Sequence, residues 1–228
     1  MKKLALFQHH PECSTQCCDG VKRALSPNYE IKTFTIDNDI DEVLNDVDGL
    51  VMPGGIGDSD SYFDFFTRTK ANKIANFISR GGRYVGICMG AYWAGSRYFD
   101  ILDKVDAVQY IKRETAEIHR SYGTVAQVKW NRLKPNQSVE IMFFYDGCTF
   151  IGDGNYETVA TYLNNESMAI IQGNVGLIGC HPESEEFWYE KPYQYLSGYY
   201  HDGRHHNLLL EFVDKLMERG QDGNAAVC

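Results

Sequence analysis

The chain has 228 residues, of which 43% are hydrophobic and 23% are charged, and its formal net charge is −9. This length suits one large α/β domain that buries enough surface to need no disulfide or metal staple. The negative charge argues against nucleic acid or an anionic membrane as the main partner, and no apolar run approaches the roughly 18 residues of a membrane span. The seven cysteines show no disulfide framework, which favours a reducing, cytoplasmic location.

The first part of the chain alternates predicted strands with predicted helices. We expect strands at 3–8, 29–36, 48–52 and 83–87, and helices at 14–25, 39–44, 63–79 and 89–98. Such alternation is typical of a parallel sheet with right-handed crossovers. Because parallel strands present ligand sites at their carboxyl ends, the segments 9–13 and 54–55 should lie near Cys88.

The second part of the chain is richer in predicted strands. We expect strands at 124–130, 139–145, 157–163, 168–172 and 175–180, and a closing amphipathic helix at 205–219. Turn residues between paired runs, such as Gly173-Asn174, favour antiparallel ribbons. We expect residues 1–220 to form one domain and residues 221–228 to form a disordered tail.

The sequence Gly86-Ile87-Cys88-Met89-Gly90 places a thiol between a predicted strand and a predicted helix. This is the elbow spacing of Gly-x-Ser-x-Gly hydrolases, with sulfur in place of oxygen. Glycines suit the tight turn because larger side chains would clash with the neighbouring strand and helix. A helix N-terminus favours thiolate over thiol, and the N–H of Met89 is a candidate oxyanion donor. The alternative is that Cys88 is a buried core cysteine.

A second candidate group, His181-Pro182-Glu183, follows the strand predicted at 175–180. Hydrolysis by a cysteine requires a base beside the sulfur and a third group that orients the base. His181 can be the base and Glu183 the orienting carboxylate. Taken alone, His181 fits a surface histidine at a strand end better, and it is the pairing with the elbow that favours a nucleophile at Cys88.

Together these motifs resemble a class I glutamine amidotransferase-type domain, and more closely the amidotransferase-like domain at the N-terminus of biotin protein ligases. The segments that share this resemblance are 13–14 with the following helix, 26–29, 52–55 with Asp58, Asp60 and Tyr62, 81–92, 144–147 and 181–183. The resemblance implies a flavodoxin-like, doubly wound, mostly parallel sheet with helices on both faces, to which the antiparallel ribbons are added. It also implies a triad of Cys88, His181 and Glu183, and a second oxyanion N–H from Gly54 or Gly55.

Two departures from the family pattern bear on the activity. Ala91-Tyr92 stands where glutamine-using members have a His-Gln pair, so a substrate other than glutamine stays open. No adenylate loop of the Gly-Arg-Gly-Arg type is present, so we expect no biotin ligase activity.

The expected substrate contacts lie in loops near the elbow and near the predicted ribbons. They are Asp58, Asp60, Tyr62, Tyr92, Asp146 and Gly147. The first three of these also fit a turn with capping carboxylates. The aromatic run from Phe187 to Tyr200 can wall a pocket for an apolar or planar substrate, or pack the C-terminal segment against the sheet.

We expect no metal and no cofactor. The group His201, His205 and His206, with Asp202 nearby, fits a solvated helix start better than a metal site, because no second ligand cluster has a matching spacing. A second group offers ligands in the loop after the first strand: His9, His10, Glu12 and Cys13. This loop fits a substrate contact better than a zinc site, because no closed tetrahedral set lies nearby.

We therefore expect a cysteine-dependent amidohydrolase or amidotransferase that forms a thioester at Cys88. Its substrate would be a small-molecule or peptide amide, and a synthetase or acceptor enzyme would be its partner. Two alternatives stay open: a non-catalytic ligand-binding or regulatory module on the same fold, and a cysteine peptidase of the superfamily.

Overall fold

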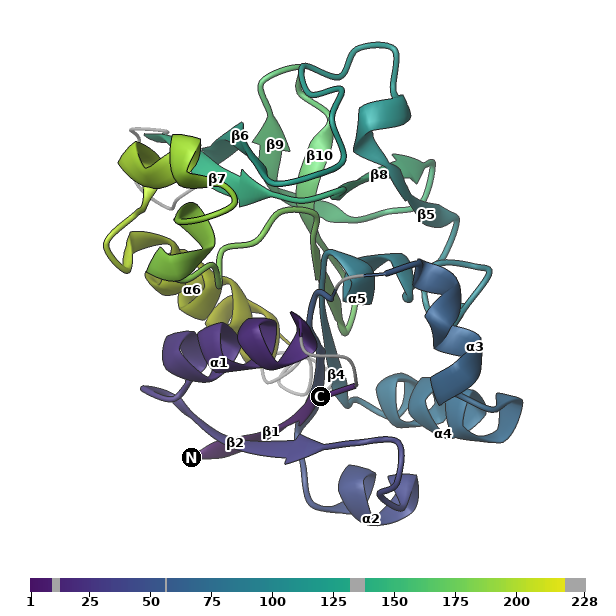
Figure 1. Cartoon of the computed structure of the whole chain (residues 1–228). Coiled ribbons are helices and arrows are strands. Elements are labelled where there is room, and N and C mark those ends of the chain that lie inside the picture. Colours follow the sequence, from purple (N-terminus) through teal and green to yellow (C-terminus); the bar gives the residue numbers. More distant parts are fainter. Residues whose placement is uncertain (10–12, 56, 132–137, 220–228) are drawn as a thin grey trace, which may run out of the picture.

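The computed structural model describes residues 1–9, 13–55, 57–131 and 138–219 (Figure 1). Within these residues, eleven strands form one mixed sheet whose main path runs β2-β1-β3-β4-β11-β10-β9-β6-β7. The strands are β1 (Lys2–Phe7), β2 (Tyr29–Phe34), β3 (Gly49–Met52), β4 (Arg83–Ile87), β5 (Val105–Gln109), β6 (Thr124–Trp130), β7 (Ser138–Phe144), β8 (Cys148–Gly152), β9 (Glu157–Tyr162), β10 (Ser167–Gln172) and β11 (Val175–Ile178). The α-helices are α1 (Cys13–Leu25), α2 (Ile40–Asn45), α3 (Tyr62–Phe65), α4 (Arg68–Ser79), α5 (Met89–Tyr92) and α6 (Arg204–Glu218). The tail expected at 221–228 lies outside the described residues.

The sheet has a parallel half and an antiparallel half. β1 pairs in parallel with β2 and β3, and β4 pairs in parallel with β3 and β11. Antiparallel pairs then join β11 to β10, β10 to β9, β9 to β6 and β6 to β7, while β8 and β5 branch from β10. The mixed α/β sheet is as predicted, whereas the expected predominance of parallel pairing holds only for β2, β1, β3, β4 and β11.

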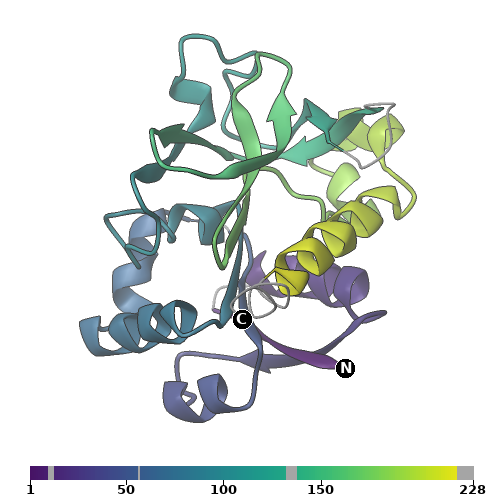
Figure 2. The ribbon, with the colours of Figure 1, turned by 180° about the vertical axis from the view of Figure 1, so that it is seen from behind.

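Two hydrophobic clusters cover the two faces of the parallel half. Successive side chains of a strand point to opposite faces. Accordingly, Leu4 and Leu6 of β1 join the cluster under α1 and α6, and Ala5 and Phe7 join the cluster under α2 and α4. Figure 1 shows α1 and α6 on one side of β4, with α3 and α4 on the other, and Figure 2 shows α6 alongside α1 from behind. The prediction of helices on both faces is confirmed for this half.

Two predicted helices are shorter than expected. The helix expected at 63–79 is divided into α3 and α4, since Thr67 caps α4 by accepting a hydrogen bond from the Lys70 N–H. The helix expected at 89–98 ends as an α-helix at Tyr92. Beyond it, both Oδ atoms of Asp106 accept hydrogen bonds from Ser96, one from its N–H and one from its hydroxyl.

The strands β5 and β8 were not expected from the sequence, and they pair with each other. The polar residues Asp106 and Gln109 obscure the apolar pattern of β5. β8 begins after a turn of only three residues that follows β7. None of the helices in the described part of the chain combines the length and apolar character that a bilayer crossing requires.

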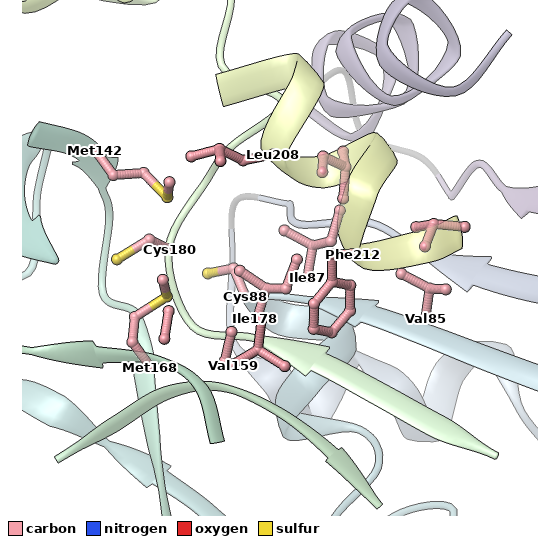
Figure 3. Packing of buried hydrophobic residues seen from close by; sticks show 14 of the residues in the cluster. Val85, Ile87, Cys88, Met142, Val159, Met168, Ile178, Cys180, Leu208 and Phe212 are labelled. Carbon is pink, nitrogen blue, oxygen red and sulfur yellow. The ribbon is translucent and has the colours of Figure 1, made fainter. Parts of the chain in front are cut away.

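The pairing of β4 with β11 brings the two ends of the candidate site together. Ile87 at the end of β4 is the partner of Ile178 at the end of β11. The Cys88 N–H donates to the Ile178 carbonyl at 2.8 Å, and the His181 N–H donates to the Phe143 carbonyl at 3.0 Å. Figure 3 shows Cys88 beside Ile87 and Ile178 within the buried cluster. The chain segments after β4 and β11 therefore leave the sheet at the same edge.

Candidate active site

Cys88 occupies a strained turn between β4 and α5. Its φ is 50° and its ψ is −104°, a backbone conformation that residues other than glycine rarely adopt. A Cβ at Gly86 would lie 2.5 Å from the Gly90 carbonyl oxygen, and a Cβ at Gly90 would lie 2.0 Å from the Met52 carbonyl oxygen. Both glycines are therefore required by close backbone approach. The sequence predicted this elbow from the glycine spacing between a predicted strand and a predicted helix.

His181 and Glu183 form a buried pair beside the elbow. His181 Nδ1 lies 2.8 Å from Glu183 Oε1, and the two residues are 3% and 0% exposed. A proton on Nδ1 is stabilised by this carboxylate, which leaves Nε2 as the basic nitrogen. Among the described residues, Nε2 has no aligned hydrogen-bond partner. The imidazole is thus oriented at one nitrogen and available at the other.

The charge environment of His181 shows that Cys88 is close to the ring. Burial by itself would lower the pKa of His181, but the negative charges of Cys88 and Glu183 outweigh burial and raise it from 6.5 to about 10. The same segments thus bring together the three residues that the sequence predicted to act together.

The loop 145–147 closes over the elbow. The Cys88 thiol donates to the Tyr145 carbonyl at 3.4 Å. The hydroxyl of Tyr92 lies 3.1 Å from the carbonyl oxygens of both Asp146 and Gly147, so its proton is shared between them. A Cβ at Gly147 would lie 2.2 Å from the Gly179 carbonyl oxygen. Tyr92 therefore holds this loop against the end of β11.

Cys17 is a neighbour of the site that the sequence analysis did not single out. The ligand atoms of Cys17, His181 and Glu183 lie within 4.8 Å of one another, so among the described residues these three could hold a metal ion such as zinc. Cys17 lies one helical turn from Gly20 on α1, and a Cβ at Gly20 would lie 2.0 Å from the Glu183 carbonyl oxygen. The Cys17-x-x-Gly20 spacing was the available signal that this helix face packs against the site.

Two cavities meet at the site and share Gly55 and Tyr145 in their walls. We call the first, of about 490 Å³, the polar cavity; it is lined by Asp58, Ser59, Cys88, Met89, Tyr92 and Asp146, among others. We call the second, of about 320 Å³, the aromatic cavity; it is lined by Phe143, Tyr145, His181, Phe187, Trp188 and Tyr193, among others. Cys88 thus faces one cavity and His181 faces the other.

The structure brings most of the expected contact residues to this site. Asp58, Tyr92 and Asp146 line the polar cavity with Met89. A Cβ at Gly54 would lie 2.6 Å from His181 Cε1, so the absence of a side chain there makes room for the imidazole. Gly55 lines both cavities, and Gly147 accepts from Tyr92.

Two of the expected contact residues lie away from these walls, within the part of the chain that the structure describes. Asp60 accepts a hydrogen bond from the Tyr98 hydroxyl at 2.9 Å and pairs with Arg97 at 2.5 Å. Tyr62 is buried in an aromatic cluster, where its ring packs against Phe66 and Phe99. Both residues support the segment that follows Asp58.

The histidines at the start of α6 are buried, so the expectation of a solvated helix start is wrong. His201 and His206 lie with their Nε2 atoms 2.9 Å and 3.2 Å from the Ser184 carbonyl oxygen. Burial and the neighbouring His206 lower the pKa of His201 to about 4, and burial and His201 lower the pKa of His205 to about 3. His201 and His206 thus hold the chain immediately after Glu183.

The loop after β1 was expected to contact substrate. His10 and Glu12 lie outside the described residues, and Cys13 begins α1. His9 is buried, and its ring packs against Phe65 and Trp93. A Cβ at Gly55 would lie 2.7 Å from His9 Nε2, so His9 packs behind the loop that both cavities share.

Comparisons with solved structures show that the fold is glutamine amidotransferase-like. A glutamine amidotransferase from Thermotoga maritima matches with a TM-score of 0.66 at 13% identity, over 95% of this chain and 98% of that one. PurLQS from the same organism matches with a TM-score of 0.61 at 16% identity, over 95% of this chain and 100% of that one.

Sequence comparison adds a more particular relationship. The family model described as the N-terminal part of biotin-protein ligase matches residues 8–115. A biotin–protein ligase of Schizosaccharomyces pombe is 28% identical over 163 residues, which cover 59% of this chain and 25% of that protein. The chain thus matches only about a quarter of that relative's length. The fold of this chain is glutamine amidotransferase-like and related to the N-terminal domain of biotin-protein ligases.

Proposed function

We propose that this protein is a cysteine-dependent amide hydrolase or amidotransferase with Cys88 as its nucleophile. The observation that supports the proposal is the parallel pairing of β4 with β11, since a strained elbow cysteine follows β4 and a buried, carboxylate-bound histidine follows β11. A nucleophile, a base and an orienting group are the set that acyl transfer through a thioester requires.

In the proposed reaction, Cys88 Sγ attacks the carbonyl carbon of an amide and His181 Nε2 takes the thiol proton. The C–N bond breaks as His181 returns that proton to the leaving nitrogen, and the acyl group stays on sulfur as a thioester. Water, or an amine or alcohol acceptor, then loses a proton to His181 and attacks the thioester, which restores the thiol. Glu183 keeps Nδ1 protonated throughout and stabilises the imidazolium.

Backbone N–H groups would hold the oxyanion in each step. Met89 is the first residue of α5, where the N–H has no acceptor within the helix, and it lines the polar cavity with Cys88. Gly55, in the wall shared by both cavities, is the second candidate donor. In a transferase reaction, the released amine or the acyl group would pass to an acceptor enzyme. A reducing location such as the cytoplasm would keep Cys88 in its thiol form.

The direct test is to incubate the protein with glutamine and with short peptides, and to trap the covalent intermediate for mass spectrometry. The proposal expects product release together with an acyl mass on the peptide that contains Cys88. Cys88→Ser and Cys88→Ala should lose turnover and the adduct. The matched control is Cys148→Ser, because Cys148 is also buried but lines neither cavity among the described residues. Full activity in Cys88→Ala would overturn the proposal.

One observation favours a second candidate, a non-catalytic ligand-binding module. The Cys88 thiol donates to the Tyr145 carbonyl, and His181 Nε2 makes no aligned hydrogen bond among the described residues. In this arrangement the thiol makes no aligned hydrogen bond to the imidazole that would have to deprotonate it, as in a protein that binds a ligand without reacting with it. The two functions differ in the fate of the ligand: a binding module returns every amide unchanged, with no mass added to Cys88.

A further inference from the structure

We propose that the aromatic cavity holds the amine half of the substrate, and that this half is an apolar, ring-bearing amino acid rather than ammonia. The inference rests on the proposed amide chemistry at Cys88, and it adds the class of amide on which that chemistry acts. It depends on three features: the order of the two cavities along the reaction path, the composition of their walls, and a positive charge beside the rings.

The order of the cavities follows from the roles of the sulfur and the imidazole. The acyl carbon has to bond to Cys88, which faces the polar cavity. The leaving nitrogen has to receive its proton from His181, which faces the aromatic cavity. The scissile amide would therefore lie where the two cavities meet, beside their shared residues Gly55 and Tyr145. Its acyl half would occupy the polar cavity and its amine half the aromatic cavity.

The aromatic cavity is walled by rings that come from two separate segments. The Trp188 ring lies 5.5 Å from the His181 ring and 5.3 Å from the Phe143 ring, measured between centroids. The Tyr193 ring lies 6.4 Å from the Tyr145 ring. These are separations at which aromatic groups attract one another, and an added ring would extend the cluster. Released ammonia would leave this apolar wall exposed to water.

One charged group at the same cavity fits a carboxylate on the amine half. Lys191 lines this cavity, and its positive charge would attract a carboxylate. A ring, a nitrogen and a carboxylate together describe an aromatic amino acid joined through its amine.

The polar cavity has the opposite character and suits the acyl half. Asp58 and Asp146 contribute carboxylates to its wall, and Lys112 contributes an ammonium group. These side chains match a compact, charged acyl group such as an aminoacyl group, whose ammonium would pair with a carboxylate. The cavities thus favour an amide with a polar acyl half and an apolar amine half.

The test compares three probes that share one acyl group: alanyl-phenylalanine, alanyl-glycine and alaninamide. We expect kcat/KM for alanyl-phenylalanine to exceed that for alanyl-glycine by about 10-fold or more, with alaninamide the poorest, because one buried ring contributes roughly this factor. Phe187→Ala should reduce the ratio of the two dipeptides several-fold. Phe63→Ala is the matched control and should leave it unchanged, because Phe187 and Phe63 are 46% and 54% exposed and Phe63 lies on α3.

A binding measurement separates failure of this inference from failure of the proposed function. Free phenylalanine is titrated into Cys88→Ala protein, alone and with Phe187→Ala or Phe63→Ala added. Weaker binding only with Phe187→Ala supports the cavity assignment, even where no probe is hydrolysed and the proposed chemistry is wrong. Two results would overturn the inference: alaninamide cleaved as well as the dipeptides, or binding that Phe187→Ala leaves unchanged.

Discussion

His181 Nδ1 lies 2.8 Å from Glu183 Oε1, and the two residues are separated in sequence by a single proline. The Ser184 carbonyl, one residue further on, lies within hydrogen-bond distance of His201 and His206. The Glu183 side chain is therefore held by His181, and the backbone directly after Glu183 is held by the histidines before and within α6. A short, rigid segment of this kind sets both the tautomer and the direction of the imidazole.

Replacing Glu183 by glutamine should remove the negative charge beside His181 while keeping a side chain of similar size that can still orient the ring. The negative charges of Cys88 and Glu183 raise the pKa of His181 to about 10 against the effect of burial. In Glu183→Gln this pKa should fall well below 10, since one of the two charges is lost. Turnover should fall by about 100-fold or more. A histidine NMR titration measures the shift, and an unchanged pKa would show that the carboxylate does not act on the ring.

Adding one methyl group at Gly54 should displace the imidazole. A Cβ there would lie 2.6 Å from His181 Cε1 and 3.4 Å from Cys17 Sγ. Displacement of a catalytic group by about 1 Å can cost about 100-fold in rate, so Gly54→Ala should lose that much turnover. Gly198→Ala is the matched control, since nothing lies within 4 Å of a Cβ at that position. Equal rates in the two variants would contradict the packing described for Gly54.

The loop over Cys88 should depend on the Tyr92 hydroxyl. In Tyr92→Phe the Asp146 and Gly147 carbonyls lose their shared donor. We expect a stability loss of about 1–2 kcal/mol, which is typical when a buried group loses its hydrogen-bond partner. Urea unfolding measures this loss. Tyr98→Phe removes a hydroxyl whose contacts are with Ser59 and Asp60, so it should leave the loop, and the labelling rate of Cys88, unchanged.

The buried histidines before and within α6 should make the fold sensitive to mild acid. The folded-state pKa of His201 is lowered to about 4 from 6.5, so the unfolded chain binds the proton more readily between these values. The stability that His201 contributes is therefore present above about pH 6.5 and is lost as the pH falls toward 4.

Urea midpoints between pH 7 and pH 4 measure this effect, which should reach the order of 3 kcal/mol for a shift of this size. His201→Gln keeps an N–H donor for the Ser184 carbonyl but does not titrate, so its pH slope should be shallower. Identical slopes in the two proteins would contradict the assignment.

The sequence predicted the elbow well because a local pattern determines it. Gly86 and Gly90 are required by approaches of 2.5 Å and 2.0 Å to backbone oxygens, and the short apolar run before Cys88 forms a buried strand. The link from Cys88 to His181 is not local. It was inferred from the chemistry that a cysteine nucleophile requires, and the parallel pairing of β4 with β11 brings the two segments together.

The features that the sequence did not predict depend on tertiary packing. Cys17 reaches His181 only because Gly20 allows α1 to approach the Glu183 backbone. The histidines before and within α6 resemble surface residues in sequence, and His201 and His206 contact a carbonyl that precedes them by many residues. The division of the aromatic residues between a cavity wall and a core also has no local signal, since Trp188 lines the cavity and Tyr189 packs in the core.

The most direct test of the central claim is the rate at which iodoacetamide alkylates each cysteine at neutral pH, resolved by mass spectrometry. Cys88 should react faster than the buried Cys18, Cys148 and Cys180, where burial raises the pKa of each thiol. His181→Gln should slow the reaction at Cys88 by about 10-fold or more, because the imidazolium that favours the thiolate is lost. A Cys88 that reacts no faster than these thiols, at a rate that His181→Gln does not change, would contradict the claim.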